Sequence, residues 1–404
     1  MKVKIVHVFI MANNANNIVQ ALRKQKENWL LRCGWSEEMR IVHVLNLAND
    51  AFNIVKPLRE KGIDADLIIK SDDFGMGLPM WEEIEIDMDP YSFDLKVALE
   101  RYDLPEWMKV WWVDDRLPLH SVLSLFNMVK GYDLLHLHSF SPIYLQFASK
   151  PFVIHEAGWI RKLVTRNSGE EKLGRRAYAY AACVVMTNPD TYTLLKTLKY
   201  KRDVFIPFVI DTKQYKPMKM EKTEDLLFFH PARHEWDVKG NDKLLMAFRK
   251  FIESGYKAKL RMVDWGYTED VSKAKEFVKR FKLESYVEWV QPYSKPALRR
   301  VYNEVDVVFD QFILGSGGTT CFEAMACEVP VVIYLNEWNR KCFGEMPPAT
   351  KARMADDIYE AMVLLSDSDV RRKIGVEERK FVLKHNHPDV VANQLIDLYE
   401  RILS

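Results

Sequence analysis

The sequence contains few cysteines, and their spacing is typical of neither a disulfide framework nor a zinc site. Its 404 residues include five cysteines, an odd number, with no C-x-x-C pair and no histidine pattern beside them. Disulfides and structural zinc sites usually show in sequence as paired or regularly spaced cysteines. We therefore expect neither feature, and no bound metal of the zinc-finger kind.

An excess of one charge is also missing. The chain has 58 basic and 57 acidic residues, a formal net charge of +1. Binding to bulk nucleic acid requires a broad basic field, so we expect no nucleic-acid partner and only local anion sites. The apolar fraction of 48% and the charged fraction of 28% are typical of globular proteins. A chain of this length exceeds what one hydrophobic core usually organises, which favours two domains.

Long apolar runs are absent as well. No stretch reaches the roughly 18 to 20 apolar residues that a membrane-spanning helix needs. The N-terminal MKVKIVHVFIMANNANN has a run of only about seven apolar residues before its asparagines, which predicts a β-strand rather than a signal peptide. We therefore expect a cytoplasmic protein.

Short apolar runs alternate with helical patterns along the whole chain. They lie at 4–9, 41–47, 66–69, 134–137, 152–154 and 183–186, and again at 226–229, 260–263, 286–290, 305–309 and 331–334. This alternation is typical of parallel sheets with crossover helices. Between the two series, Pro207 and Pro217 interrupt both periodicities. We predict an α/β fold of two Rossmann-like, doubly wound domains, residues 1–208 and 209–375, followed by helices at 376–404.

The N-terminal region contains a duplication. Residues 4–23 match residues 40–59 at twelve of twenty positions, KIVHVFIMANNANNIVQALR against RIVHVLNLANDAFNIVKPLR. Only the second copy continues into a helix stop and a further strand, as a βαβ unit requires. We therefore favour the second copy as the first unit of the sheet and interpret 1–39 as an added, partly duplicated strand and helix. Asn13 and Asn49, after the two strands, remain rival candidates for the cleft.

Two cations occupy the loop after the predicted strand 226–229. Arg233 and Lys239 precede a helix with one apolar stripe from Leu244 to Ile252. Strand-end loops of open parallel sheets face the ligand crevice, where an arginine fork and a lysine charge suit a diphosphate. Exposed loop cations are common in any protein, so solvated side chains are the alternative.

A glycine-rich loop, DQFILGSGGTT at 310–320, follows the strand predicted at 305–309. Its candidate donor-binding residues are Gly315, Ser316, Gly317, Gly318 and Thr319. Glycines let the backbone approach a phosphate, and free N–H groups at a helix start bind anions without a metal ion. Glu323 lies one turn further along the same helix face, where its carboxylate can accept hydrogen bonds from ribose hydroxyls. The loop has neither the G-x-G-x-x-G nor the Walker pattern, and a solvated Glu323 is the alternative.

These segments resemble the retaining GT-B glycosyltransferases of family 4, the glycosyl transferases group 1, and the resemblance covers most of the chain. Arg233 and Lys239-Gly240 match the family's Arg and Lys-Gly at the same separation. FEAMACEVPVV at 322–332 resembles its lEAMAxGxPVV signature, and IPFVID at 206–211 resembles its interdomain junction. The resemblance implies that Arg233 and Lys239 hold the donor pyrophosphate and Glu323 the ribose, with Gln291 and Pro292 beside the base.

The N-terminal half carries weaker matches. LHLH at 135–138 and VIHEAG at 153–158 resemble the family's strand-end histidine segments on the acceptor side. The resemblance implies that His155 contacts the transferred sugar and places His138 and Glu156 near the acceptor, while a hydrogen-bonded core histidine is an equal alternative. In the family, the last helix crosses back to the first domain.

Two positions depart from the family pattern. Gly315 stands where the family has the first glutamate of its E-x7-E pair, which usually touches the donor sugar; Asp310 could substitute through a longer loop. Glu328 replaces a glycine after the helix, where a left-handed conformation would cost about 1 kcal/mol.

The resemblance implies a metal-independent transferase without a cofactor, whose co-substrate is a nucleoside diphosphate sugar. The acceptor is a sugar, a lipid-linked molecule or another small molecule. Alternatives of the same architecture are a nucleotide-sugar epimerase, a sugar phosphorylase, or a non-catalytic nucleotide-sugar-binding protein. Clustered aromatics at 104–112 and a basic region at 161–176 are compatible with peripheral contact with the inner face of a membrane, or with packed aromatics beside a solvated helix.

Overall fold

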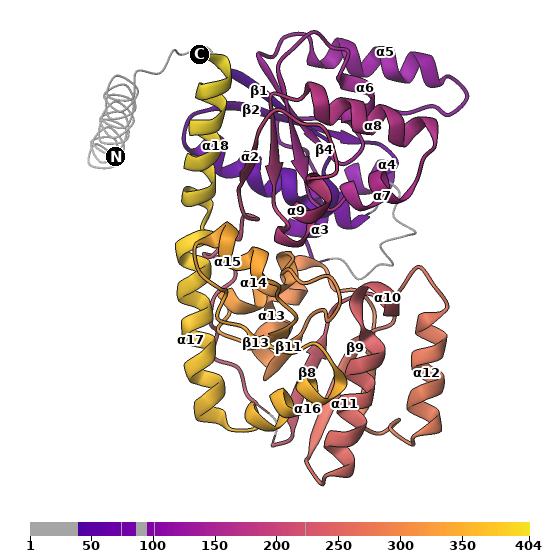
Figure 1. Cartoon of the computed structure of the whole chain (residues 1–404), viewed down its shortest axis with the longest axis vertical. Coiled ribbons are helices and arrows are strands. Elements are labelled where there is room, and N and C mark those ends of the chain that lie inside the picture. The colour runs from indigo at the N-terminus through magenta and orange to yellow at the C-terminus, as the bar shows by residue number, and fades with distance from the viewer. Residues whose placement is uncertain (1–38, 74, 86–94, 101, 223) are drawn as a thin grey trace, which may run out of the picture. The chain divides into compact units, whose positions relative to one another are not determined.

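The computed structural model describes residues 39–73, 75–85, 95–100, 102–222 and 224–404. Residues 41–404 form one compact unit that contains two separate sheets (Figure 1). This confirms the predicted α/β class with two Rossmann-like domains. The first copy of the duplication, the strand predicted at 4–9 and Asn13 lie outside the described residues.

The first sheet has the strand order β3-β2-β1-β4-β5-β6-β7, with every pair parallel. Its strands are β1 Arg40–Val44, β2 Asp64–Lys70, β3 Met108–Trp111, β4 Leu134–His138, β5 Phe152–Glu156, β6 Cys183–Met186 and β7 Asp203–Phe205. All residues of β4, β5 and β6 are buried, which explains their nearly continuous apolar runs. The two edge strands, β3 and β7, bury fewer side chains and are not predicted by the sequence pattern.

Helices connect these strands. They are α2 Asp50–Glu60, α3 Pro79–Glu83, α4 Leu95–Leu99, α5 Pro118–Val129, α6 Pro142–Leu145, α7 Ile160–Thr165, α8 Gly169–Tyr180 and α9 Tyr192–Leu195. The second copy of the duplication forms β1 and α2, and β1 lies at the centre of the sheet. The aromatic segment 104–112 contains β3, whose Trp111 is buried and donates its indole N–H to the carbonyl of Ser121 at 2.7 Å, whereas Trp112 is exposed.

The second sheet has the order β10-β9-β8-β11-β12-β13 and is also parallel. Its strands are β8 Leu226–His230, β9 Ala258–Val263, β10 Val287–Val290, β11 Val307–Phe309, β12 Val331–Ile333 and β13 Thr350–Lys351. Its helices are α10 Trp236–Lys239, α11 Asn241–Glu253, α12 Asp270–Arg280, α13 Lys295–Glu304, α14 Thr319–Ala326, α15 Glu337–Phe343 and α16 Ala355–Leu364. The apolar stripe of α11 packs on this sheet, as its spacing predicts.

Two long helices end the chain, α17 Ser368–His385 and α18 Pro388–Leu403. Helix α18 packs against α2 of the first half (Figure 1). Helix α17 packs against α14, where Gly375 makes room for the backbone of Glu328. Glu328 has a φ of +61°, so the left-handed turn is kept although its residue is not glycine. The predicted domain limits at 208 and 375 stay predictions; the last strand of the first sheet ends at Phe205.

Both sheets reverse their strand order at one point. In the first sheet β1 and β4 are neighbours, and in the second β8 and β11 are neighbours, with later strands added outward on either side. Ligands of open parallel sheets bind beyond the carboxyl ends of the strands at such a reversal. The loops after β1, β4, β8 and β11 are therefore the places to look for a site.

Candidate active site

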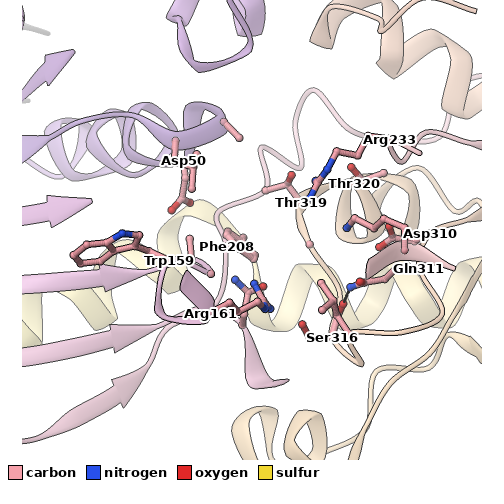
Figure 2. Close-up of a pocket in the computed structure, with 18 of the residues that line it drawn as sticks. Asp50, Trp159, Arg161, Phe208, Arg233, Asp310, Gln311, Ser316, Thr319 and Thr320 are labelled. Atoms are coloured by element: carbon pink, nitrogen blue, oxygen red, sulfur yellow. Dashed lines mark hydrogen bonds between the residues drawn. The ribbon is translucent and has the colours of Figure 1, made fainter. Parts of the chain in front are cut away.

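A cavity of about 440 Å³ lies at the carboxyl ends of strands from both sheets. Loops after β1, β4, β5 and β6 line it on one side, and loops after β8 and β11 line it on the other. Figure 2 shows Asp50, Trp159 and Arg161 from the first half and Arg233 and Asp310 from the second around this space.

Arg233 and Lys239 both line the cavity, as predicted for the loop after β8. The Arg233 guanidinium lies 2.6 Å from the carboxylate of Glu235 and over the ring of Tyr267. Among the described residues, no carboxylate lies within ion-pair distance of the Lys239 ammonium, and burial lowers its pKa, partly opposed by the charge of Asp310. An incompletely neutralised cation beside an arginine in a cavity is a site for an anion.

Asn241, the first residue of α11, holds the cation loop in shape. Its amide donates to Nε2 of His230 at 2.6 Å and to the carbonyl of Arg233 at 3.1 Å, and its oxygen accepts from the N–H of Glu235 at 3.0 Å. Nδ1 of His230 lies 2.6 Å from the carbonyl of Phe309 on β11, so it donates there while Nε2 accepts. Burial lowers the pKa of His230 to about 3, which keeps the imidazole neutral. The sequence analysis missed both residues.

The glycine-rich loop reaches the same cavity. Ser316, Gly318, Thr319 and Thr320 line it, and Thr319 begins α14. The loop is tied to the cation loop because the N–H of Phe312 donates to the carbonyl of Lys239 at 2.8 Å.

Asp310, immediately after β11, is buried and lines the cavity. Burial raises the pKa of its carboxyl, while the charge of Lys239 and the N–H of Gly318 act in the opposite direction. An anion bound at Lys239 would therefore also lie close to the carboxyl of Asp310. Whether Asp310 replaces the family's missing glutamate stays a prediction.

Gly315 itself does not line the cavity. It has a φ of +85°, and a Cβ atom there would lie 3.0 Å from the side chains of Asn336 and Tyr334. Its carbonyl accepts from the N–H of Asn336 at 2.9 Å and from the amide of Asn339 at 2.8 Å. Gly317 is also buried against Cys321. A side chain at 315 would therefore be strained and would have to displace Asn336 and Tyr334.

Glu323 lies on α14 and is only 3% exposed, so it is not a solvated helix residue. Its carboxylate contacts the ammonium of Lys295 and accepts from the hydroxyl of Tyr302 at 3.2 Å. Glu323 is not among the residues that line the cavity, and neither are Gln291 and Pro292, which follow β10. Their predicted contacts with the ribose and base stay predictions.

His155, at the end region of β5, is buried and does not line the cavity. Its Nε2 lies 2.6 Å from Oδ2 of Asp50, and its Nδ1 lies 3.0 Å from Nε2 of His136. Asp50, the first residue of α2, does line the cavity. The predicted contact of His155 with the sugar stays a prediction, and the carboxylate of Asp50 separates the imidazole from the space.

The other predicted acceptor-side residues are buried within the first half. His138 lies among the histidines behind the cavity. The amide of Asn49 donates to the carbonyls of Met76 and Leu78, both at 3.1 Å.

Glu156 shapes the loop after β5 from within. Its carboxylate accepts from the N–H groups of Gly158 and Ile160 and from the hydroxyl of Tyr178. Burial raises the pKa of Glu156 despite these donors. These contacts give Glu156 a structural role in presenting Gly158 and Arg161, which line the cavity.

The sequence did not predict that Asp50 lines the cavity, and it indicated Arg161 only as part of a basic region. Arg161 lines the cavity and pairs with Asp190 at 2.6 Å, and Asp190 also accepts from the hydroxyl of Ser316. The signal for Asp50 was available, because it begins the helix that follows the central strand β1.

Part of the basic region at 161–176 is engaged within the protein. Arg175 donates to the carbonyls of Leu163 and Arg166, and the guanidinium of Arg176 lies over the rings of Phe147 and Tyr180. Among the described helices, none combines the length and apolar character that a membrane span requires.

Residues 211–346 match the family model described as "Glycosyl transferases group 1". This segment contains the cation loop, the glycine-rich loop and Glu323. A comparison with curated protein sequences gives no match.

Solved structures of glycosyltransferases share the fold across nearly the whole chain. Anabaena Alr3699/HepE, solved with UDP and glucose, is 15% identical, with a TM-score of 0.68 over 90% of this chain and 100% of its own. A glycosyltransferase from Rickettsia africae gives 13% identity and a TM-score of 0.65 over 91% and 100%. Sucrose-phosphate synthase from Thermosynechococcus elongatus gives 14% identity and a TM-score of 0.64 over 90% and 99%.

At these identities the structural likeness establishes the fold. The match over residues 211–346 adds a sequence pattern, and that pattern coincides with the loops that line the second-half side of the cavity. Together, the GT-B fold and the glycosyl transferases group 1 segment support a glycosyltransferase.

Proposed function

We propose that the protein transfers a sugar from a nucleoside diphosphate sugar to an acceptor hydroxyl, with retention at the anomeric carbon and without a metal ion. The observation that carries the proposal is the pair Arg233 and Lys239 in the cavity where the second sheet reverses its strand order. A diphosphate would neutralise Lys239, whose ammonium has no ion-pair partner among the described residues.

Two structural relatives support this choice of donor. HepE was solved with UDP-glucose, and an alpha-glucosyltransferase with UDP and a DNA 13-mer. We do not propose DNA binding for this chain, because its near-neutral charge argues against a nucleic-acid partner.

In the proposed reaction the bond between the anomeric carbon and the leaving phosphate oxygen breaks, and a bond to the acceptor oxygen forms. The acceptor proton passes to the leaving phosphate. Negative charge that develops on the phosphate meets Arg233, Lys239 and the N–H groups at the start of α14, which are in place before the reaction. A nucleophilic side chain is not required.

The donor site is tested by Arg233→Ala and Lys239→Ala. Lys243→Ala, on the neighbouring helix α11, is the matched control. Each cavity variant should lower kcat/KM for the donor by about 10²- to 10³-fold, as expected on removing an electrostatic contact to the transition state. A thermal-shift screen of UDP, GDP and ADP and their sugars would identify the base through stabilisation by the ligand. Donor binding equal to wild type in both cavity variants would refute the phosphate assignment.

Metal independence has a separate test. Transfer should survive a strong chelator, because two cations, Arg233 and Lys239, line the cavity in which the phosphates would bind. Activity that disappears with the chelator and returns with Mg²⁺ or Mn²⁺ would contradict this part of the proposal.

Gly315 favours a second candidate, a nucleotide-sugar-binding protein without transferase activity. It lacks the acid that touches the sugar in the family, and a side chain in its turn would be strained and crowded. Tight binding of a nucleoside diphosphate sugar, with no transfer to any of a panel of sugar acceptors and no hydrolysis, would favour this candidate. Product formation that requires an acceptor would exclude it and also exclude an epimerase.

A lipid-linked acceptor at the inner face of a membrane is compatible with those cations of the basic region at 161–176 that have no ion pair among the described residues. Liposomes that contain anionic lipid should sediment the protein at low salt and release it at high salt, because charge attraction is screened. No sedimentation at either salt concentration would favour a small soluble acceptor.

A further inference from the structure

Asp50 occupies an unusual position for a carboxylate. It begins α2, its side chain is 5% exposed, and it nevertheless lines the cavity. Figure 2 shows it on the first-half side of the pocket, away from Arg233 and Asp310. A buried carboxylate needs a polar partner, and the imidazole of His155, which does not line the cavity, lies 2.6 Å from it.

A continuous series of ring nitrogens starts at this carboxylate. Nε2 of His155 lies 2.6 Å from Oδ2 of Asp50, and Nδ1 of His155 lies 3.0 Å from Nε2 of His136. Nδ1 of His136 lies 2.6 Å from the hydroxyl of Tyr399 on α18. The C-terminal helix is therefore connected to the cavity through two imidazoles.

The series continues beyond Tyr399. Its hydroxyl lies 3.2 Å from Nε2 of His43, and Nδ1 of His43 lies 3.0 Å from Nε2 of His138. The four imidazoles and the phenol are all buried. We call them the imidazole chain: His155, His136, Tyr399, His43 and His138.

With neutral rings, one arrangement of protons satisfies every contact of the chain. A proton on Nε2 of His155 avoids the repulsion of two bare acceptors 2.6 Å from each other. Nδ1 of His155 then accepts from Nε2–H of His136, whose Nδ1 accepts from the hydroxyl of Tyr399.

The remaining contacts, from Tyr399 to His138, alternate donor and acceptor in the same way. The oxygen of Tyr399 accepts from Nε2–H of His43, whose Nδ1 accepts from Nε2–H of His138. Burial lowers the pKa values of His43, His136 and His138, which keeps these rings neutral at neutral pH. All donors of the chain therefore point toward Asp50.

A metal ion is the alternative occupant of this cluster. Two triads have candidate ligand atoms within 4.8 Å of one another, His43 with His136 and His138, and Asp50 with His138 and His155. The rings of His136 stack on those of His43 and His138 at interplanar angles of 25° and 16°. Stacked rings direct their lone pairs side by side rather than to one point, which favours the hydrogen-bonded chain.

We infer that Asp50 binds a neutral hydroxyl of the acceptor and that the imidazole chain positions its carboxylate for that contact. The inference rests on the proposed function. A carboxylate repels a diphosphate, and the cations that suit the diphosphate, Arg233 and Lys239, belong to the other half. Because His155 contacts Oδ2, the other carboxylate oxygen is available to accept from a hydroxyl.

The kinetic test uses UDP-glucose as donor and methyl α-glucoside as acceptor, with Asp50→Asn as the isosteric variant. The acceptor KM should rise about 10- to 100-fold, as expected for a lost hydrogen bond to a charged group, while the donor KM and the thermal shift with UDP stay unchanged. An unchanged acceptor KM, or an equal rise in the donor KM, overturns the inference alone. Failure of the wild type to transfer any sugar overturns the proposed function and the inference with it.

The positioning role is tested by Tyr399→Phe, which removes only the hydroxyl that joins the two halves of the chain. The acceptor KM should rise less than in Asp50→Asn. Tyr132→Phe is the matched control, because its buried hydroxyl donates to Asp66 outside the chain. An equal effect of the two phenylalanine variants would reduce the chain to a packing role and overturn its part of the inference.

Ring ¹⁵N NMR reads the chain without any activity. Wild type should show protons on Nε2 alone for His155 and His136, and Tyr399→Phe should show a tautomer mixture at His136. A proton on Nδ1 of His155, a doubly protonated His155, or ring signals of His43, His136 and His138 that shift together with one equivalent of Zn²⁺ would overturn the positioning chain.

Discussion

The two sheets share a strand order but present different chemistry at their carboxyl ends. The second sheet presents charged and glycine-rich loops, with Arg233 and Lys239 after β8 and the segment 310–320 after β11. The first sheet presents Asp50, with buried imidazoles behind it. The second half suits an anion, whereas the first half suits a hydroxyl. A site built from both can hold a charged donor and a neutral acceptor in separate places.

The halves also differ in how they hold their side chains. In the second half, short loops are fixed by neighbours in sequence, as Asn241 fixes the loop at 233–240. In the first half, contacts join positions far apart in sequence, such as His136 and Tyr399. Variants in the two halves should therefore differ in how they change stability and substrate binding.

The largest effect on stability is expected from Asn241→Ala, which tests whether neighbours in sequence fix the loop of the second half. It removes three hydrogen bonds and leaves Nε2 of His230 and the N–H of Glu235 without a partner. The free energy of unfolding should fall by about 2 to 4 kcal/mol, and the donor KM should rise at least about 10-fold. Urea unfolding and donor kinetics measure the two effects.

Asn303→Ala is the control, because Asn303 is buried and hydrogen-bonded in the same half but away from the cavity. It should lose stability without a change in donor KM. A wild-type donor KM in Asn241→Ala would show that the loop keeps its shape unaided.

An intermediate effect should separate folding from binding within the glycine-rich loop. Gly315→Ala places a Cβ at a φ of +85° and 3.0 Å from two side chains, so it should cost about 1 to 3 kcal/mol of stability. Gly318→Ala meets no heavy atom within 4 Å, so stability should change by less than about 0.5 kcal/mol. Because Gly318 lines the cavity, its variant should still raise the donor KM.

Thermal unfolding and donor kinetics on both glycine variants give the readout. Equal stability of the two variants would contradict the strain at Gly315. An unchanged donor KM in Gly318→Ala would place the phosphate elsewhere.

The smallest effect concerns the pH dependence of the first half. Burial lowers the pKa of His138 well below 6.5, so below about pH 6.5 the unfolded chain binds a proton that the native state does not. Stability from this group is complete above pH 6.5 and falls with decreasing pH, by about 1.4 kcal/mol per pH unit. His138→Gln should make the slope shallower by that amount between about pH 6.5 and 5.

Urea unfolding at several pH values measures this slope. Comparison with wild type cancels the opposite contribution of the buried carboxyls Asp310 and Glu156, whose pKa values burial raises. Parallel slopes in the two proteins would mean that His138 is protonated in the native state.

Much of the second-half site could be predicted because its information is contiguous. Arg233 and Lys239 lie in one loop, and 310–323 carries the glycines, the helix start and Glu323. Strand periodicity places both loops at the same end of a parallel sheet, where the cations and the glycine-rich loop line one cavity. It could not show that Lys295 and Tyr302 contact Glu323.

The first-half site could not be predicted in the same way. His43, His136 and His155 each occupy one position of an apolar strand, where a core histidine and a functional one look alike. Asp50 lies in the duplicated segment, and its place after β1 marks it as a candidate without showing that it contacts His155. Their contacts require the register of β1, β4 and β5, which side-chain alternation alone does not specify.

The sequence by itself determined the α/β class, the two series of strands and the cation and glycine-rich loops, because these depend on local periodicity and on short segments. Only the tertiary structure decided that Asp50 faces the cavity in front of His155, that a side chain at position 315 would be strained, and that Tyr399 completes the chain behind Asp50. The physical reason is that hydrogen bonds between buried groups depend on distances of about 3 Å. Packing sets those distances between residues that are hundreds of positions apart.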